Sequence, residues 1–180
     1  MESHRKPPID EFEKLLTDDT LRSMSIIQAA LGSGVVLFMF IVIAMYFSME
    51  SGQAGDPQLI WILTLVHFIL AANMIFLSSW MYKRRLTADA IAKSSPTGTI
   101  DAASCLDALR NAIIIRLAFL EGAAFYGLVV CIVAVMNGVM QENPIYWINL
   151  ASAFVMLLHV AWLFPSRDRL LEFYKNDFQI

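Results

Sequence analysis

The sequence predicts an all-α, polytopic membrane protein with four transmembrane helices, arranged as two parallel helical-hairpin repeats. Three observations support this prediction. Hydrophobic residues make up 58% of the chain and charged residues only 16%, whereas soluble domains carry about 25% charged residues. Four apolar segments are each long enough to cross about 30 Å of hydrocarbon, which takes roughly 20 helical residues. Finally, two stretches of the chain resemble each other.

The four apolar segments divide the chain in a simple way. We expect the spans at residues 24–47, 58–82, 111–136 and 145–164. The rest is short and follows from these limits: an inner surface segment (1–23), an inner loop (83–110) and an inner tail (165–180). Since little chain is left for a separate folded unit, residues 1–180 are predicted to be a single membrane domain.

The basic residues predict the orientation of the spans. Neither residues 48–57 nor residues 137–144 contain a Lys or Arg. Positive charge is retained on the cytoplasmic side of a membrane, so both termini and the middle loop should be cytoplasmic in a multi-pass protein of a bacterial-type inner (plasma) membrane. The basic side chains that carry this prediction are Arg5, Lys6, Lys14 and Arg22 before the first span, Lys83, Arg84, Arg85, Lys93 and Arg110 in the middle, and Arg167, Arg169 and Lys175 at the end.

The internal repeat pairs the first span with the third and the second with the fourth. Residues 19–34 align with residues 107–122, with the same residue type at seven of the sixteen positions: Asp, Leu, Arg, Ile, Ile, Ala and Gly. Trp61 and Ile62 match Trp147 and Ile148 after a two-residue change of offset. Both copies begin on the same side, so we interpret the chain as a parallel repeat rather than an inverted one.

Glu121 is the residue most suggestive of function, because it lies in the middle of the third span. A charge at the bilayer centre costs about 3 kcal/mol on insertion scales. By helical rise from the outer ends, four polar residues share a depth of about 21–22 Å. They are Ser33, Asn73, Glu121 and His159. We expect Glu121 to be protonated near neutral pH unless His159 or Arg116 pairs with it, because hydrocarbon favours the neutral carboxyl.

Two interpretations of Glu121 stay open. It could bind and release a proton or offer an oxygen to Na⁺, with His159, Asn73 and Ser33 near it. It could instead only form a hydrogen bond to a neighbouring helix, as buried polar groups in membranes often do. Small residues that allow close helix approach accompany these positions, namely Gly32, Gly34, Gly122 and Gly127.

No cofactor and no metal site are predicted. His67 and His159 could suggest a haem with two axial histidines, but their depths differ by about 7 Å. A packing or partner-facing role is the better interpretation of His67. Cys105 and Cys131 are expected in different environments, which argues against a disulfide, and two thiols do not make a metal site. Arg116 lies about 140° around the helix from Glu121 and can extend to the headgroups.

The third span carries a family resemblance. Residues 118–130, Ala-Phe-Leu-Glu-Gly-Ala-Ala-Phe-Tyr-Gly-Leu-Val-Val, resemble the carboxylate-bearing helix of rotor subunit c of F-type ATP synthases. The resemblance implies that Glu121 would be the ion-carrying residue. It covers about one span, and the rest departs from the family. Subunit c has a glycine-rich first helix and outer termini, whereas this chain has only Gly32 and Gly34 in its first span and predicted inner termini.

These observations favour a non-enzymatic integral membrane subunit that associates with itself or with other membrane subunits and carries a protonatable glutamate. The alternative is a proton- or Na⁺-translocating subunit resembling a duplicated c-type hairpin. An enzyme is not expected, because the sequence contains no catalytic triad, phosphate loop or zinc motif. The predicted partners are the lipid bilayer and membrane helices, and nothing indicates a nucleic acid.

Overall fold

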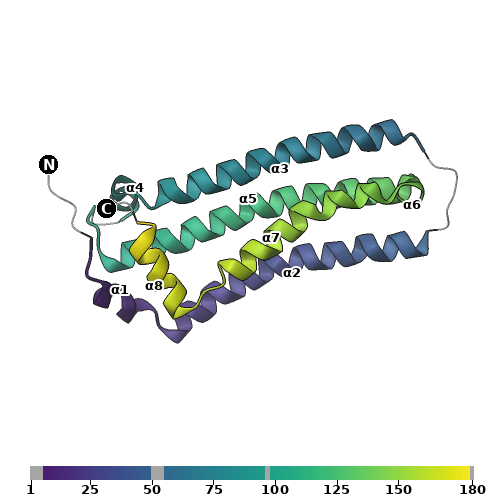
Figure 1. The fold of residues 1–180 in the computed structure, drawn as a ribbon. Coiled ribbons are helices and arrows are strands. Elements are labelled where there is room, and N and C mark those ends of the chain that lie inside the picture. The colour runs from purple at the N-terminus through teal and green to yellow at the C-terminus, as the bar shows by residue number, and fades with distance from the viewer. Residues whose placement is uncertain (1–5, 50–54, 96–97, 179–180) are drawn as a thin grey trace.

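Four long helical legs run side by side in the computed structural model, which describes residues 6–49, 55–95 and 98–178 (Figure 1). The first three legs are α2 (Asp18–Ser48), α3 (Pro57–Arg85) and α5 (Ala102–Met136), and the fourth combines the 3₁₀ helix η1 (Pro144–Leu150) with α7 (Ala151–Trp162). Each is long and apolar enough to cross a membrane. The prediction of an all-helical chain with four helices that can cross a membrane is therefore confirmed.

Short polar side chains begin the helices. Asp56 accepts a hydrogen bond from the backbone N–H of Gln58 at the start of α3, and proline at the next position suits a helix start because its missing N–H is not needed there. Asp101 and Ser104 form a capping box at the start of α5. This reciprocal pair satisfies two backbone N–H groups that the first turn leaves free.

The capping box also explains why α5 is longer than its predicted span. The helix begins at Ala102, inside the stretch 83–110 that the sequence suggested was a loop, and that stretch also contains α4 (Ala88–Ser94). Parts of the predicted segments lie outside the described residues. These are residues 1–5 of the surface segment, residues 50–54 between the first two spans, residues 96–97 of the inner loop and residues 179–180 of the tail.

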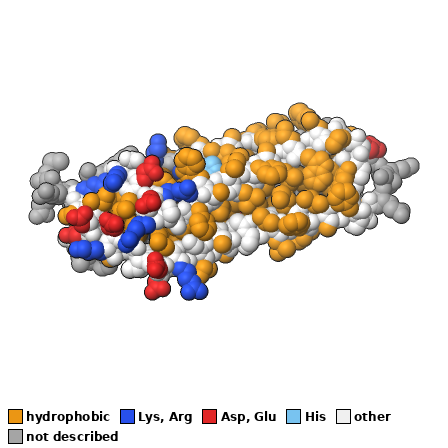
Figure 2. Space-filling view, turned by 60° about the horizontal axis from the view of Figure 1, so that its bottom comes forward, with side chains coloured by type: hydrophobic (Ala, Val, Ile, Leu, Met, Phe, Trp, Pro, Cys, Tyr) orange, Lys and Arg blue, Asp and Glu red, His pale blue; other side chains and the backbone are white. Residues whose placement is uncertain are grey.

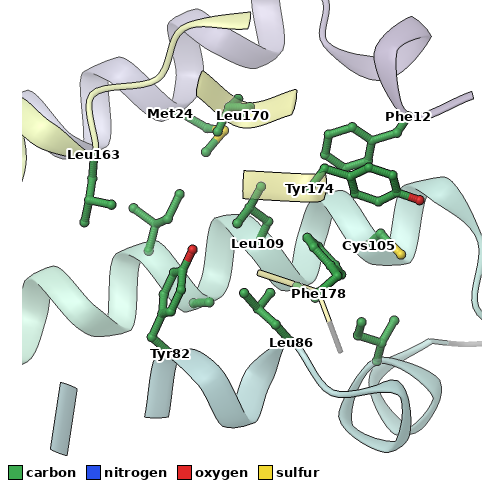
Figure 3. Packing of buried hydrophobic residues seen from close by; sticks show 14 of the residues in the cluster. Phe12, Met24, Tyr82, Leu86, Cys105, Leu109, Leu163, Leu170, Tyr174 and Phe178 are labelled. Carbon is green, nitrogen blue, oxygen red and sulfur yellow. The ribbon is translucent and has the colours of Figure 1, made fainter. Parts of the chain in front are cut away.

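One end of the bundle, which we call the capped end, is covered by α1 (Ile9–Leu15), α4 and α8 (Arg167–Asn176) (Figure 1). Phe12 of α1 stacks on Tyr174 of α8 with ring centroids 4.1 Å apart, and both belong to a cluster of buried side chains (Figure 3). Burial raises the pKa of Tyr174 to about 12, so its hydroxyl stays protonated and donates to the Pro7 carbonyl over 2.7 Å. Charged side chains gather at this end, whereas hydrophobic ones dominate the rest of the visible surface (Figure 2).

The opposite end contains the turn between α5 and the fourth leg. Gly138 has a φ of 70°, a left-handed conformation that glycine adopts without strain, and the short α6 (Val139–Glu142) follows it. Asn143 then caps η1 by accepting a hydrogen bond from the backbone N–H of Ile145. The fourth leg thus returns toward the capped end along α5.

The central helix of the bundle is α5. It packs against α2, α3 and α7, whereas α2 and α3 lie on different sides of it and barely touch within the described residues (Figure 1). In the most apolar stretch of α5, 50% of the residues are buried, compared with 22% in that of α2 and 17% in that of α3. The gap between α2 and α3 therefore leaves part of the surface of α5 without a neighbouring helix.

Candidate functional site

Glu121 lies on the side of α5 that faces α2. A Cβ atom added at Gly34 of α2 would be 3.8 Å from Glu121 Oε1, so the carboxyl occupies space that a glycine leaves free. Glu121 is half-buried, and the structure gives it no hydrogen bond or ion pair from any residue in 6–49, 55–95 or 98–178. The carboxyl therefore lies within an apolar helix without a partner from the described residues.

Beside Glu121, α5 presents an exposed stripe between α2 and α3, which we call the open face. It consists of Asn111, Ala118, Gly122, Val129 and Met136. Phe125 marks its α2 side, where the ring meets Phe38 edge-on at 5.5 Å, and Tyr126 marks its α3 side, where the ring stacks on His67 at 6.0 Å. A Cβ atom added at Gly122 would meet nothing within 4 Å. No described residue therefore covers the open face at Gly122.

The other three members of the predicted polar layer do not converge on Glu121. Ser33 and Asn73 are exposed, and each donates to a carbonyl of its own helix, Ser33 to Ala30 over 2.9 Å and Asn73 to Ile69 over 2.7 Å. His159 is half-buried, and its Nδ1 lies 2.8 Å from the carbonyl oxygen of Val155, one turn earlier in α7. The structure thus places these side chains on separate faces of the bundle.

A second polar cluster, which the sequence did not predict, surrounds the buried His67. His67 Nδ1 lies 2.9 Å from Asn149 Oδ1, and His67 Nε2 lies 2.9 Å from Ser152 Oγ. Because the amide oxygen only accepts, Nδ1 carries a proton and donates to it, and Nε2 forms the second hydrogen bond with the serine hydroxyl. Asn149 Nδ2 donates to Thr64 Oγ1 and to the Tyr146 carbonyl. This cluster joins α3 to the fourth leg through a histidine whose two ring nitrogens are both paired.

Gly127 allows this cluster to form against α5. A Cβ atom at this position would lie 2.3 Å from the Asn149 carbonyl oxygen and 2.7 Å from His67 Nε2. Both distances are far shorter than van der Waals contact, so any larger residue would separate α5 from η1 or from α3. Gly127, which the sequence analysis predicted to be a packing position, therefore packs closely against Asn149 and His67. An added Cβ atom at Gly32, by contrast, would lie next to Val160 and Leu157 at ordinary van der Waals distances.

Two polar side chains closer to the capped end, Gln28 and Arg116, contain buried atoms without a hydrogen-bond partner among the described residues; in Arg116 the atom is Nε. Gln28 is 1% exposed, and neither its amide oxygen nor its amide nitrogen has a hydrogen-bond partner among the described residues. The Arg116 guanidinium lies over the Tyr82 ring, 5.2 Å from its centroid, and the Tyr82 hydroxyl donates to Asp177 over 2.6 Å. Arg116 therefore contacts α3 at the capped end and does not meet Glu121.

The described residues contain no group of three His, Cys, Asp or Glu side chains placed to hold a metal ion. Cys105 and Cys131 are both free and buried, in different clusters of the core. The candidate site that the geometry offers is accordingly the open face with Glu121 at its edge.

No family model matches the chain, and no curated protein or solved structure matches it either.

Proposed function

We propose that this chain is a non-enzymatic subunit of a membrane assembly, and that the open face of α5 is where another membrane helix docks. The observation that carries the proposal is the partnerless Glu121 beside an exposed stripe of the central helix. In hydrocarbon, helices associate through close packing and hydrogen bonds rather than through exclusion of water. A docked helix that supplies a hydrogen-bond partner would offset the cost of holding this carboxyl in the membrane.

Within this proposal the capped end is cytoplasmic, since it carries the basic residues of both termini and of the middle of the chain. The membrane is a bacterial-type inner membrane. The hairpins α2–α3 and α5–α7 are two copies of one ancestral unit, and the identities between residues 19–34 and 107–122 support this origin. Their surroundings now differ, because α5 occupies the centre and α2 the periphery.

The experiment that tests the proposal compares two tryptophan substitutions after extraction in a mild detergent. Gly122→Trp fills the open face, where an added Cβ atom meets nothing within 4 Å, and Leu37→Trp changes a side chain of α2 that is 64% exposed. We expect native gels of the wild type and of Leu37→Trp to show an assembly larger than one chain, and Gly122→Trp to shift to the monomer. A wild-type chain that migrates alone, also after cross-linking in the membrane, contradicts the proposal.

A second candidate, a proton- or Na⁺-translocating subunit, is favoured by one observation. The Glu121 carboxyl borders a lipid-accessible face, so a hydrophobic carbodiimide could reach it from the bilayer. The resemblance of residues 118–130 to the ion-binding helix of subunit c also supports this candidate. A carrier should be labelled at Glu121 at neutral pH, with Na⁺ or acid changing the labelling rate. Unchanged ion flux through reconstituted Glu121→Gln, with Glu142→Gln as the exposed control, would eliminate it.

A further inference from the structure

Asn73 and Glu121 lie at the same depth, as contacts within the structure indicate. His67 of α3 and Gly127 of α5 are in contact, since a Cβ atom at Gly127 would be 2.7 Å from the histidine ring. The two helices are antiparallel, and Asn73 follows His67 by six residues while Glu121 precedes Gly127 by six. Each therefore lies about 9 Å from this contact toward the capped end. Ser33 shares the level, because its neighbour Gly34 lies against the Glu121 carboxyl.

Within one chain Asn73 cannot reach Glu121. Asn73 follows the buried Ala71 by two residues, about 200° around α3, so it points away from α5. Glu121 lies on the opposite side of α5 from the Tyr126 ring, toward α2. Both side chains are thus polar groups at one level of the hydrocarbon, on two different outer sides of the bundle.

The remaining hydrogen-bonding capacity singles out Asn73 over Ser33. The only donor of Ser33 is used by the Ala30 carbonyl. Asn73 uses one N–H on the Ile69 carbonyl and retains a second N–H and its amide oxygen. A protonated carboxyl offers one donor and one acceptor, which is the complement of what Asn73 has left. An amide opposite an ionised carboxyl still donates one hydrogen bond.

We propose, resting on the function proposed above, that the partner at the open face is a second copy of this chain, whose α3 brings Asn73 to Glu121. Copies related by rotation about the membrane normal keep the depth of every residue, so the Asn73 of one copy meets the Glu121 of the next without a change of level. Because the two residues are on different sides of each copy, the contact is head-to-tail. Contacts of this kind close into a ring when the rotation permits.

Cysteine cross-linking tests this contact directly. In a background with Cys105→Ala and Cys131→Ala, one tagged copy carries Asn73→Cys and a differently tagged copy carries Glu121→Cys. Oxidation in the membrane should shift the mixture from 20.2 kDa to about twice that mass, with both tags in the product. Neither variant alone should give this product. The matched control is Ile62→Cys with Glu121→Cys, because Ile62 is exposed on the same side of α3 but about 16 Å from Asn73 along the helix.

A non-covalent test avoids any change to the buried cysteines. Asn73→Leu should lose the self-assembly that the native gel reports, and Ser33→Leu, which changes another exposed residue at the same level, should keep it. Cross-linking between two Glu121→Cys copies, or an assembly that contains one copy of this chain with another protein, would overturn the second-copy proposal and leave the subunit proposal intact. A chain that stays monomeric under every condition would remove both.

Discussion

Replacing Gly127 by alanine should destabilise the bundle far more than its size suggests. The added methyl would lie 2.3 Å from the Asn149 carbonyl oxygen and 2.7 Å from His67 Nε2. Overpacking of this kind costs about 1–3 kcal/mol. If η1 moves away, the hydrogen bonds around His67 weaken as well, at about 0.6 kcal/mol each in a membrane interior. Alanine returns about 1 kcal/mol in helix propensity, which leaves a net loss of about 1–4 kcal/mol.

The chain offers matched controls for this change. Gly122→Ala gains the same helix propensity and meets nothing within 4 Å, and Gly32→Ala makes ordinary contact with Val160 at 3.5 Å. Both should be neutral or up to about 1 kcal/mol more stable than the wild type. The difference between Gly127→Ala and Gly122→Ala, about 1–5 kcal/mol, isolates the steric overlap from the propensity of glycine itself.

The assay is unfolding of the purified, dilute protein in mixed micelles by titration with a denaturing detergent, followed by tryptophan fluorescence and circular dichroism. Dilution keeps association at the open face from contributing to the measured free energy. If Gly127→Ala unfolds at the same detergent fraction as Gly122→Ala, the close approach of α5 to the His67 cluster does not stabilise the fold, and the reasoning above is wrong.

Three further predictions concern the polar groups of the bundle. His67→Leu should destabilise by about 1–3 kcal/mol in the same assay, because it leaves the Asn149 oxygen buried without a donor; unchanged unfolding would refute this. Gln28→Met should stabilise by about 1–3 kcal/mol, because neither polar atom of the buried amide is satisfied, whereas the exposed Gln58→Met should have no effect. Hydrogen bonds from Ser104 hold the pKa of Asp101 below its ordinary 3.8, so the cap's contribution is present above that value and lost as the pH falls through the lower folded pKa. Asp101→Asn, a cap that does not titrate, should remove this acid-dependent loss, and an unaltered profile would contradict the assignment.

The sequence predicts depth well because helical rise is the same in every helix. Counting from the segment ends placed Ser33, Asn73 and Glu121 at one level, and the contacts of Gly34 with Glu121 and of His67 with Gly127 give the same alignment. The limits of the apolar segments likewise identified four helices that could cross a membrane. The helix starts extend beyond the apolar segments because the capping box at Asp101 depends on hydrogen bonding and not on hydropathy.

The direction in which a side chain points could not be predicted in the same way. In a soluble helix the apolar side faces the core, but in lipid both the inner and outer sides are apolar, so the pattern carries no such signal. α5 has apolar residues on every side, although Leu120 is buried and Val129 is 46% exposed. Counting along the helices therefore predicts a common level for Glu121 and Asn73 and suggests a shared site within one chain, whereas burial places them on different faces.

The same limit explains why the His67 cluster was missed and what could have revealed it. His67 and Gly127 are each nine residues from the outer end of their predicted spans, which places both at about 14 Å. A glycine at the level of a buried histidine marks a point where two helices can approach closely enough for that histidine to reach a third. Asn149 and Ser152, three residues apart and thus on one face of the fourth leg, supply the partners. Glu121 has the opposite arrangement: its level contains a glycine on α2 that makes room for the carboxyl, but Ser33 and Asn73 at that level are exposed. A polar group whose complement lies at its own depth on the outer surface is satisfied most simply by a neighbouring copy.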